Sequence, residues 1–327
     1  MSTRRRWLAA GAAWPALACT GALRAQAKPP VVIGYLSGGR RDALGLLDAF
    51  TEGMAALGWK LGVQYVLEER HAEGQPERLP ALAQELATIK PALIVASGSP
   101  STGAANQAAP TTPVVLINGD PMFSGLVKDL ARPGGMITGT SNMTAETSLK
   151  VIELLVETMP KLQRIGVLAD STVMSSNSVA LNLIRGTAKR LRVEAVIAEL
   201  AGPPDLDPAF VRFAKAKVQA VVVLPSAWFG AHLPAITRSA LAQRWPVVGT
   251  YSNIPRLGGL FSYGANTEAL ARRSAYHVDR ILKGAKPGDL AIEQPTTFNL
   301  VLNLKTAKAL GITMPQSMMI RATEVIE

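Results

Sequence analysis

The most specific stretch of this sequence lies near its C-terminus and begins with the run Gly258-Gly259-Leu260-Phe261-Ser262-Tyr263-Gly264-Ala265-Asn266. Paired glycines precede a short apolar run, which predicts a buried strand with a tight turn at its start. Residues 275–287 then carry a helical pattern that ends near Gly284, and residues 294–307 predict a final strand leading into a helix. This order of strand, helix and strand is typical of an α/β fold.

The same alternation extends through the first half of the chain. Apolar runs at 31–35, 92–96 and 113–117 predict buried strands, and the alternating Val63, Tyr65 and Leu67 predict another. Between them lie helical stripes, formed by Leu46, Phe50, Met54 and Leu57 and by Leu79, Leu82, Leu86 and Ile89. Strands that alternate with helices favour a parallel sheet covered on both faces.

The pattern then starts again in the second half, after a helix that carries Leu149, Ile152, Leu155 and Val156. Residues 164–169 predict the first strand of a second sheet, and residues 193–200, 220–224 and 247–249 predict the strands that continue it. A chain of 327 residues is long enough for two domains, and its 48% hydrophobic content can fill two cores. We therefore expect two similar doubly wound α/β lobes, with changes of lobe near 138–146 and 256–266.

The first 27 residues have the pattern of a signal peptide. Arg4, Arg5 and Arg6 precede an apolar stretch from residue 7 to 18, and Ala25-Gln26-Ala27 is an Ala-x-Ala cleavage site. The pattern predicts export to the periplasm by a Sec or a twin-arginine signal, and both routes stay open. Cys19, the only cysteine, is the alternative attachment point of a lipoprotein, although we favour an incidental cysteine within the signal.

The composition of the remaining chain argues against several classes of function. Without Arg4, Arg5, Arg6 and Arg24, the 34 basic residues become 30 against 24 acidic ones, a net charge of +6. These basic residues are scattered and do not form a stripe with interleaved aromatics, so we expect no nucleic-acid partner. The three histidines lack metal-ligand spacing, and no Gly-x-Ser-x-Gly or paired-carboxylate pattern is present. We therefore predict no metal, no cofactor and no catalytic residue.

A ligand site is predicted by the residues that come directly after each strand, because ligands of open parallel sheets bind beyond the carboxyl ends of the strands. The side chains found there are polar and mostly neutral, with three aromatic rings, which suits an organic solute. The candidates are Tyr35, Ser37, Ser97, Ser99, Thr102, Asn118 and Asp120 from the first half, and Asp170, Ser176, Asn177, Ser226, Trp228 and Tyr251 from the second.

Several of these candidates have a second interpretation. The loop from Ser97 to Gly103 could present helix N-terminal amides to an anion, or could be an ordinary turn with serine capping. Trp228 and Tyr251 could stack on a ligand ring or fill the space between lobes. Asp120 and Asp170 could bind an amine or cap a following helix.

The chain resembles the periplasmic substrate-binding proteins of an ABC-transporter family with the type I periplasmic-binding-protein fold. The resemblance rests on residues 50–59 (FTEGMAALGW), 126–135 (LVKDLARPGG) with Thr138-Gly139, the block 262–307, and 321–327 (RATEVIE). It implies that the chain crosses between the lobes three times, so that a multi-segment hinge joins them around a ligand cleft. The expected first lobe comprises 28–140 and about 262–295, and the second about 141–261 and 296–327.

The resemblance also implies a function. A periplasmic receptor would capture a small organic solute, such as an aromatic amino acid or related ring compound, by closure of the lobes. It would deliver that solute to an ABC permease in the inner membrane and act as a monomer. The alternatives are a sensor that presents its closed form to a membrane receptor and, less favoured, an exported enzyme.

Overall fold

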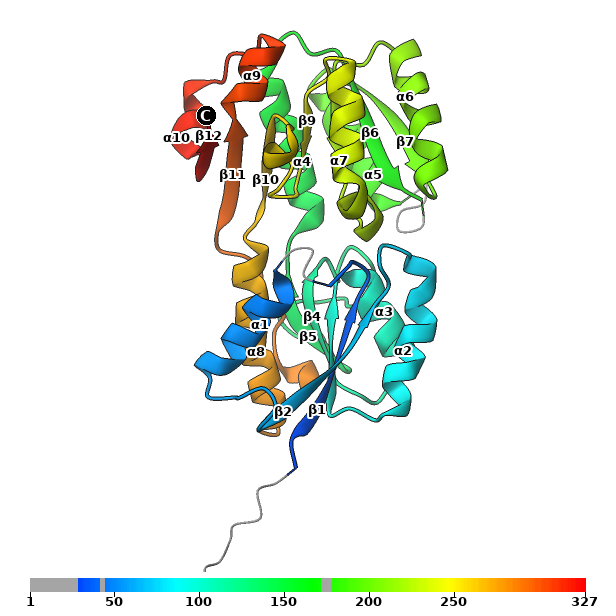
Figure 1. The fold of residues 1–327 in the computed structure, drawn as a ribbon, viewed down its shortest axis with the longest axis vertical. Helices are drawn as coiled ribbons and strands as arrows, with labels where there is room; N and C mark the ends of the chain where they lie inside the picture. The colour runs from blue at the N-terminus through cyan, green and yellow to red at the C-terminus, as the bar shows by residue number, and fades with distance from the viewer. Residues whose placement is uncertain (1–28, 42–44, 172–177) are drawn as a thin grey trace, which may run out of the picture.

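The chain forms two α/β lobes, drawn one above the other in Figure 1. This computed structural model describes residues 29–41, 45–171 and 178–327. The first lobe has a five-stranded sheet in the order β2-β1-β3-β4-β5, and the second a seven-stranded sheet in the order β12-β11-β10-β9-β8-β6-β7. The fold class expected from the sequence, two doubly wound lobes, is confirmed.

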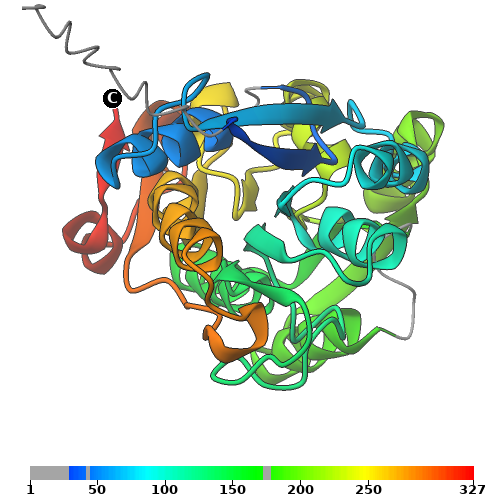
Figure 2. The ribbon, with the colours of Figure 1, turned by 90° about the horizontal axis from the view of Figure 1, so that it is seen from below.

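The first sheet is parallel throughout and covered by helices on both faces. Its strands are β1 (Val31–Ser37), β2 (Tyr65–His71), β3 (Leu93–Ser97), β4 (Val114–Gly119) and β5 (Ile137–Ser141). Its helices are α1 (Leu46–Ala56), α2 (Leu79–Thr88), α3 (Ser99–Ala108) and α8 (Thr267–Leu282). Seen from below in Figure 2, α1 and α8 lie together on one side, and α2 and α3 lie together on the other.

Successive residues of these strands point to opposite faces, and both faces are apolar. Leu93 and Val95 of β3 join the core under α1 and α8, whereas Ile94 and Ala96 join the core under α2 and α3. A strand buried on both faces must be apolar at every position, which explains the continuous apolar runs in the sequence. The edge strand β2 differs, because it begins at Tyr65 and runs through charged residues to His71. The prediction that Val63 belongs to this strand was wrong, since Val63 is exposed in the preceding loop.

The second lobe repeats this plan. Its strands are β6 (Arg164–Asp170), β7 (Glu194–Leu200), β8 (Ala220–Val223), β9 (Val247–Gly249), β10 (Phe261–Ala265), β11 (Phe298–Asn303) and β12 (Glu324–Ile326). Its helices are α4 (Thr144–Thr158), α5 (Val179–Arg190), α6 (Leu206–Lys215), α7 (Ala227–Ala242), α9 (Leu304–Leu310) and α10 (Gln316–Arg321). Short 3-10 turns at Pro76–Arg78, Pro203–Asp205, Pro255–Leu257 and Pro287–Asp289 each begin at a proline, whose fixed φ suits a first helical position.

The chain passes between the lobes after β5, after β10 and before β11. The sequence assigned residues from about 262 to the first lobe, but Phe261–Ala265 pairs with β9 and β11 in the second sheet, so the second crossing follows Ala265. Near the end of this strand, Gly264 packs against the backbone of Thr250. A Cβ at position 264 would be 2.6 Å from Thr250 O.

One strand pair departs from the parallel pattern. β10 and β11 are antiparallel, because β10 leaves the second lobe toward the hinge and β11 returns from the hinge. The other crossings are also held together: Ser141 N donates to Glu293 O at 2.8 Å, and Glu293 N donates to Gly139 O at 2.9 Å. The three crossing segments therefore lie side by side and form the hinge.

Candidate functional site

A cavity of about 320 Å³ lies between the two lobes and is lined by residues of both. Parallel strands of each sheet end at this cavity, so residues far apart in the sequence meet there. We call it the cleft cavity. Its volume lies at the lower end of the range for small-molecule sites.

All the predicted site residues in the described chain line the cleft cavity except Thr102. Those that line it are Tyr35, Ser37, Ser97, Ser99, Asn118, Asp120, Asp170, Ser226, Trp228 and Tyr251. Thr102 is fully buried within α3, and its hydroxyl donates to Gly98 O at 3.0 Å, so its prediction as a cavity residue was wrong. Ser176 and Asn177 lie outside the described residues.

Several serine hydroxyls of the set are engaged in local structure. Ser226 Oγ caps α7 by accepting a hydrogen bond from Phe229 N at 3.1 Å. Ser99 Oγ accepts one from Asp120 N at 2.9 Å, and Ser37 Oγ accepts one from Gly39 N at 3.2 Å. These bonds fix the loops at the strand ends, but only that of Ser226 caps a helix. Helix α3, which follows the loop from Ser97, has Gly98 as its N-cap residue and no side-chain cap, so the capping alternative for that loop is not what the structure shows.

The aromatic residues of the second lobe form a rigid wall. Trp228 is 6% exposed, stacks on His232 with ring centroids 5.1 Å apart, and meets Phe229 edge-on at 4.4 Å. Tyr251 OH donates to Ser226 O, and burial, assisted by the nearby Asp170 carboxylate, raises the pKa of Tyr251 above its usual value. Trp228 is therefore a core residue and a cavity residue at once.

Buried polar atoms without partners gather around this cavity. In the part of the chain that the structure describes, no hydrogen-bond partner is present for Ser101 Oγ, His71 Nδ1, Trp228 Nε1 or Asn253 Oδ1, and all four residues line the cavity. Buried polar atoms are normally paired, and an unpaired one costs free energy. Such atoms on both walls indicate a site that a polar ligand completes.

His71 and Asn253 are cavity residues that the sequence analysis missed. His71 ends β2, and its Nε2 lies 3.0 Å from Glu69 Oε2, while Arg41 also binds Glu69 and holds the pKa of that carboxyl below its usual value. An ionised carboxylate only accepts hydrogen bonds, so Nε2 donates to Glu69 and Nδ1 is the ring nitrogen left without a partner. The expectation that ligand-binding residues lie at the carboxyl ends of strands would have identified His71 if the predicted strand had been extended through its charged residues.

The described residues offer no evident place for a metal ion. Across residues 29–41, 45–171 and 178–327, no three His, Cys, Asp or Glu side chains lie close enough together to hold one. Nor does any helix in these ranges have the length and apolar content needed to cross a bilayer.

Comparisons with known proteins agree with this architecture. A tyrosine-binding protein of Clostridioides difficile (strain R20291) is 24% identical over 264 residues, which cover 80% of this chain and 75% of that protein. A solved ABC domain of Streptococcus pneumonia in complex with L-Trp is 25% identical, with a TM-score of 0.83, covering 91% of this chain and 100% of that one. A conserved domain protein of Vibrio cholerae has the same identity and coverage and a TM-score of 0.84.

The sequence profile of ABC transporter substrate binding proteins matches residues 32–326, which is nearly all of the described chain. The two lobes, the cavity between them and the similar solved structures agree with that match. The protein belongs to the family of ABC transporter substrate binding proteins.

Proposed function

We propose that this protein is a periplasmic receptor that captures an aromatic amino acid in the cleft cavity and delivers it to an ABC importer. The observation that carries the proposal is the set of unpartnered buried polar atoms on both walls of the cavity. A solute bound there would contact both lobes at once, so it would favour the closed arrangement over an open one.

The walls supply the groups that an aromatic amino acid needs. Tyr35, Trp228 and Tyr251 offer flat faces, and Leu46, Leu79 and Leu233 add apolar surface around them. One solved relative is a complex with L-Trp and another relative is a tyrosine-binding protein, and both amino acids belong to this chemical class. We therefore favour aromatic amino acids over sugars.

The two charged ends of the amino acid have complementary groups on opposite walls. On the first lobe, α3 begins at the cavity, and its N-terminal end favours an anion; Ser101 Oγ, in a residue 1% exposed, lacks a partner there. On the second lobe, the Asp170 carboxylate, in a residue 3% exposed, offers negative charge to an ammonium group. We propose that the carboxylate contacts the first lobe and the ammonium the second.

Location and delivery belong to the same proposal. The basic residues, the apolar stretch and the Ala-x-Ala site within residues 1–27 support export, and family membership supports a permease as partner. Because one chain supplies both walls of the cavity, a monomer suffices for capture.

Isothermal titration calorimetry of the purified protein with L-tryptophan, L-tyrosine and L-phenylalanine tests the proposal. The protein is first unfolded, dialysed and refolded to remove any co-purified ligand, and L-leucine and D-arabinose serve as controls. We expect saturable binding of at least one aromatic amino acid and none of the sugar. A refolded protein that melts cooperatively but binds no aromatic amino acid would refute the ligand class.

A further inference from the structure

The N-terminus of α4 is not capped by its own N-cap residue. Its N-cap residue, Met143, lies in the left-handed region at φ 52°, ψ 47°, and makes no side-chain capping bond. Among the described helices, α5, α7, α8 and α9 are capped by the side chain of their own N-cap residue, whereas α1, α2, α3, α6 and α10, like α4, are not. The first turn of α4 therefore takes its capping acceptor from elsewhere.

That acceptor comes from the other lobe. Asp120 follows β4 of the first lobe, and its Oδ2 accepts a hydrogen bond from Ala145 N of α4 at 3.2 Å. Its Oδ1 accepts a longer one from Phe123 N at 3.3 Å. Helix α4 packs against β10, β9 and α5, which belong to the second lobe. One carboxylate thus joins the wall of the first lobe to a helix of the second.

A cluster of polar groups continues this contact along the first crossing. Asn142 Nδ2 donates to Asn118 Oδ1 at 3.1 Å, Thr144 Oγ1 donates to Asn142 Oδ1 at 2.6 Å, and Asn142 N donates to Gly119 O at 2.9 Å. Asn118 is itself in the left-handed region, at φ 58°. Asn118, Asp120, Asn142 and Thr144 all line the cleft cavity. We call these four residues the hinge cluster.

The carboxyl of Asp120 is held in place at a cost. Burial raises its pKa above the usual value, with a small contribution from Glu146, while the bonds from Ala145 N and Phe123 N oppose the rise. A negative charge at a helix N-terminus interacts favourably with the helix dipole, and this favours the position next to α4. Both oxygens of Asp120 already accept hydrogen bonds from the backbone, so its geometry suits holding the hinge better than binding a ligand amine.

We propose that Asp120 is a positioning residue that favours the closed arrangement of the lobes by capping α4 across the hinge. The inference rests on the proposed closure around a solute. When only part of the protein population is competent to bind, the apparent affinity for every ligand falls by the same fraction. Loss of the cap should therefore weaken all ligands equally, without any change in ligand preference.

The test compares Asp120→Ala with Asp120→Asn, since asparagine keeps one acceptor oxygen for a backbone N–H, whereas its amide nitrogen only donates. Affinities for L-tryptophan and L-tyrosine are measured by calorimetry, and small-angle X-ray scattering gives the radius of gyration of the ligand-free proteins. The control is Asp129→Ala, which removes one exposed side-chain bond to a backbone amide, that of Ala131 N, within the first lobe.

We expect Asp120→Ala to weaken both amino acids by the same factor, about fivefold for one lost cap, and to increase the ligand-free radius of gyration. Asp120→Asn, which can accept only one of the two bonds, should restore both quantities in part, and Asp129→Ala should leave them at the wild-type values. Weakening of one amino acid alone at an unchanged radius would overturn the proposal and make Asp120 a ligand contact. If neither amino acid binds, the scattering alone decides, and an unchanged radius in Asp120→Ala would overturn the proposal independently of the ligand.

Discussion

Trp228 shows how a single residue combines packing with recognition. Its ring is held by His232 and Phe229, so it cannot reorient freely, yet its Nε1 lacks a partner in the described structure. The sequence left open whether this residue stacks on a ligand or fills the core. The structure shows why the two cannot be separated by residue type, because the same indole does the packing and lines the cavity.

Replacing Trp228 by phenylalanine should separate these two roles. The substitution keeps an aromatic ring in the wall but removes the N–H donor, so we expect affinity for a bound amino acid to fall about fivefold to tenfold. Trp228→Ala should instead lower the free energy of unfolding by about 3–5 kcal/mol, because it empties a core position. Calorimetry and thermal melts measure the two effects. Unchanged affinity in Trp228→Phe would mean that Nε1 does not meet the ligand.

Most of the cavity could be predicted from the sequence because buried strands have a clear apolar signature and their carboxyl ends follow directly. Tyr35, Ser97 and Asp170 were found in this way. The rule failed where a strand lacks that signature, as in β2, whose charged residues concealed His71. It also failed for Thr102, because the sequence does not show which way a hydroxyl in the first turn of a helix points.

At the scale of elements, α1 and α8 cross at close range. A Cβ at Gly53 would lie 2.3 Å from Arg272 O and 2.9 Å from Ala275 Cβ, so only glycine lets the helices approach this closely. Trp59 Nε1 donates to Asp279 Oδ1 at 2.9 Å and ties the end of α1 to α8. This glycine in mid-helix is costly for α1 alone and is explained by the packing.

Gly53→Ala should destabilise the protein even though alanine is the better helix former. Alanine favours the helix by about 1 kcal/mol, but forcing a methyl group against backbone costs about 1–3 kcal/mol. The matched control is Gly186→Ala in α5, where a Cβ would have nothing within 4 Å, and which should therefore raise stability. Urea unfolding of both variants gives the comparison. Stabilisation by both would show that α1 and α8 can move apart freely.

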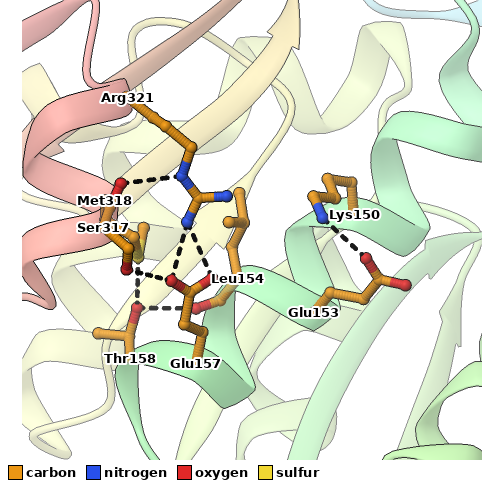
Figure 3. A network of polar contacts seen from close by, with 8 residues as sticks. All are labelled: Lys150, Glu153, Leu154, Glu157, Thr158, Ser317, Met318 and Arg321. Atoms are coloured by element: carbon orange, nitrogen blue, oxygen red, sulfur yellow. Dashed lines mark hydrogen bonds and ion pairs between the residues drawn. The ribbon is translucent and has the colours of Figure 1, made fainter.

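The C-terminal elements are attached to the second lobe by a polar network between α10 and α4, shown in Figure 3. Arg321 Nη2 donates to both oxygens of Glu157 at 2.8 and 2.9 Å, and Ser317 Oγ donates to the same carboxylate. Next to this carboxylate, Thr158 Oγ1 lies 2.9 Å from Met318 Sδ. The hydrogen bond from Ser317, assisted by Arg321, lowers the pKa of Glu157.

Glu157→Gln should reduce stability by about 0.2–1 kcal/mol at neutral pH, since the pair is partly exposed. A carboxyl with a lowered folded pKa stabilises fully above its unfolded value of about 4.3 and loses that contribution as pH falls through the folded pKa. The difference between variant and wild type should therefore shrink below about pH 4.3 and vanish once pH is below the folded pKa. High salt should also reduce it. Glu194→Gln, which breaks the exposed pair of Glu194 with Arg164, is the control for a pair within one sheet. A difference that persists at low pH would assign the effect to packing.

At the scale of the whole molecule, the three crossings explain what the sequence could and could not predict. The repeated strand-helix pattern indicates two lobes, because each lobe must fill its own core. The crossings set the order in which the chain enters the second sheet. No local sequence pattern therefore predicts that β11 is antiparallel or that the second crossing follows Ala265. Near the third crossing, Arg273 of α8 binds Glu293 with two bonds of 2.7 and 2.8 Å.

His277 lies beside this part of the hinge and should make the stability of the whole protein depend on pH. It is 1% exposed, its Nε2 donates to Ala291 O at 3.0 Å, and burial lowers its pKa, although that bond and the Glu293 carboxylate oppose the shift. The folded protein therefore keeps the ring neutral, whereas the unfolded chain takes up a proton near pH 6.5. Unfolding then binds a proton, and stability falls as pH decreases from about 6.5.

Thermal melts between pH 8 and pH 5 measure this dependence, with His277→Gln as the comparison. Glutamine can still donate to Ala291 O but does not titrate, so its melting temperature should fall less steeply below pH 6.5. The slope is the readout, because the absolute melting temperature also reflects the altered hydrogen bond. Each uncompensated proton changes stability by about 1.4 kcal/mol per pH unit, a slope that melts resolve.

The pKa of Glu293 is lowered by its bond to Arg273, so the contribution of that carboxyl is lost only at lower pH and does not enter this window. Equal slopes in the two proteins would mean that the fold accommodates a charged His277 beside Glu293.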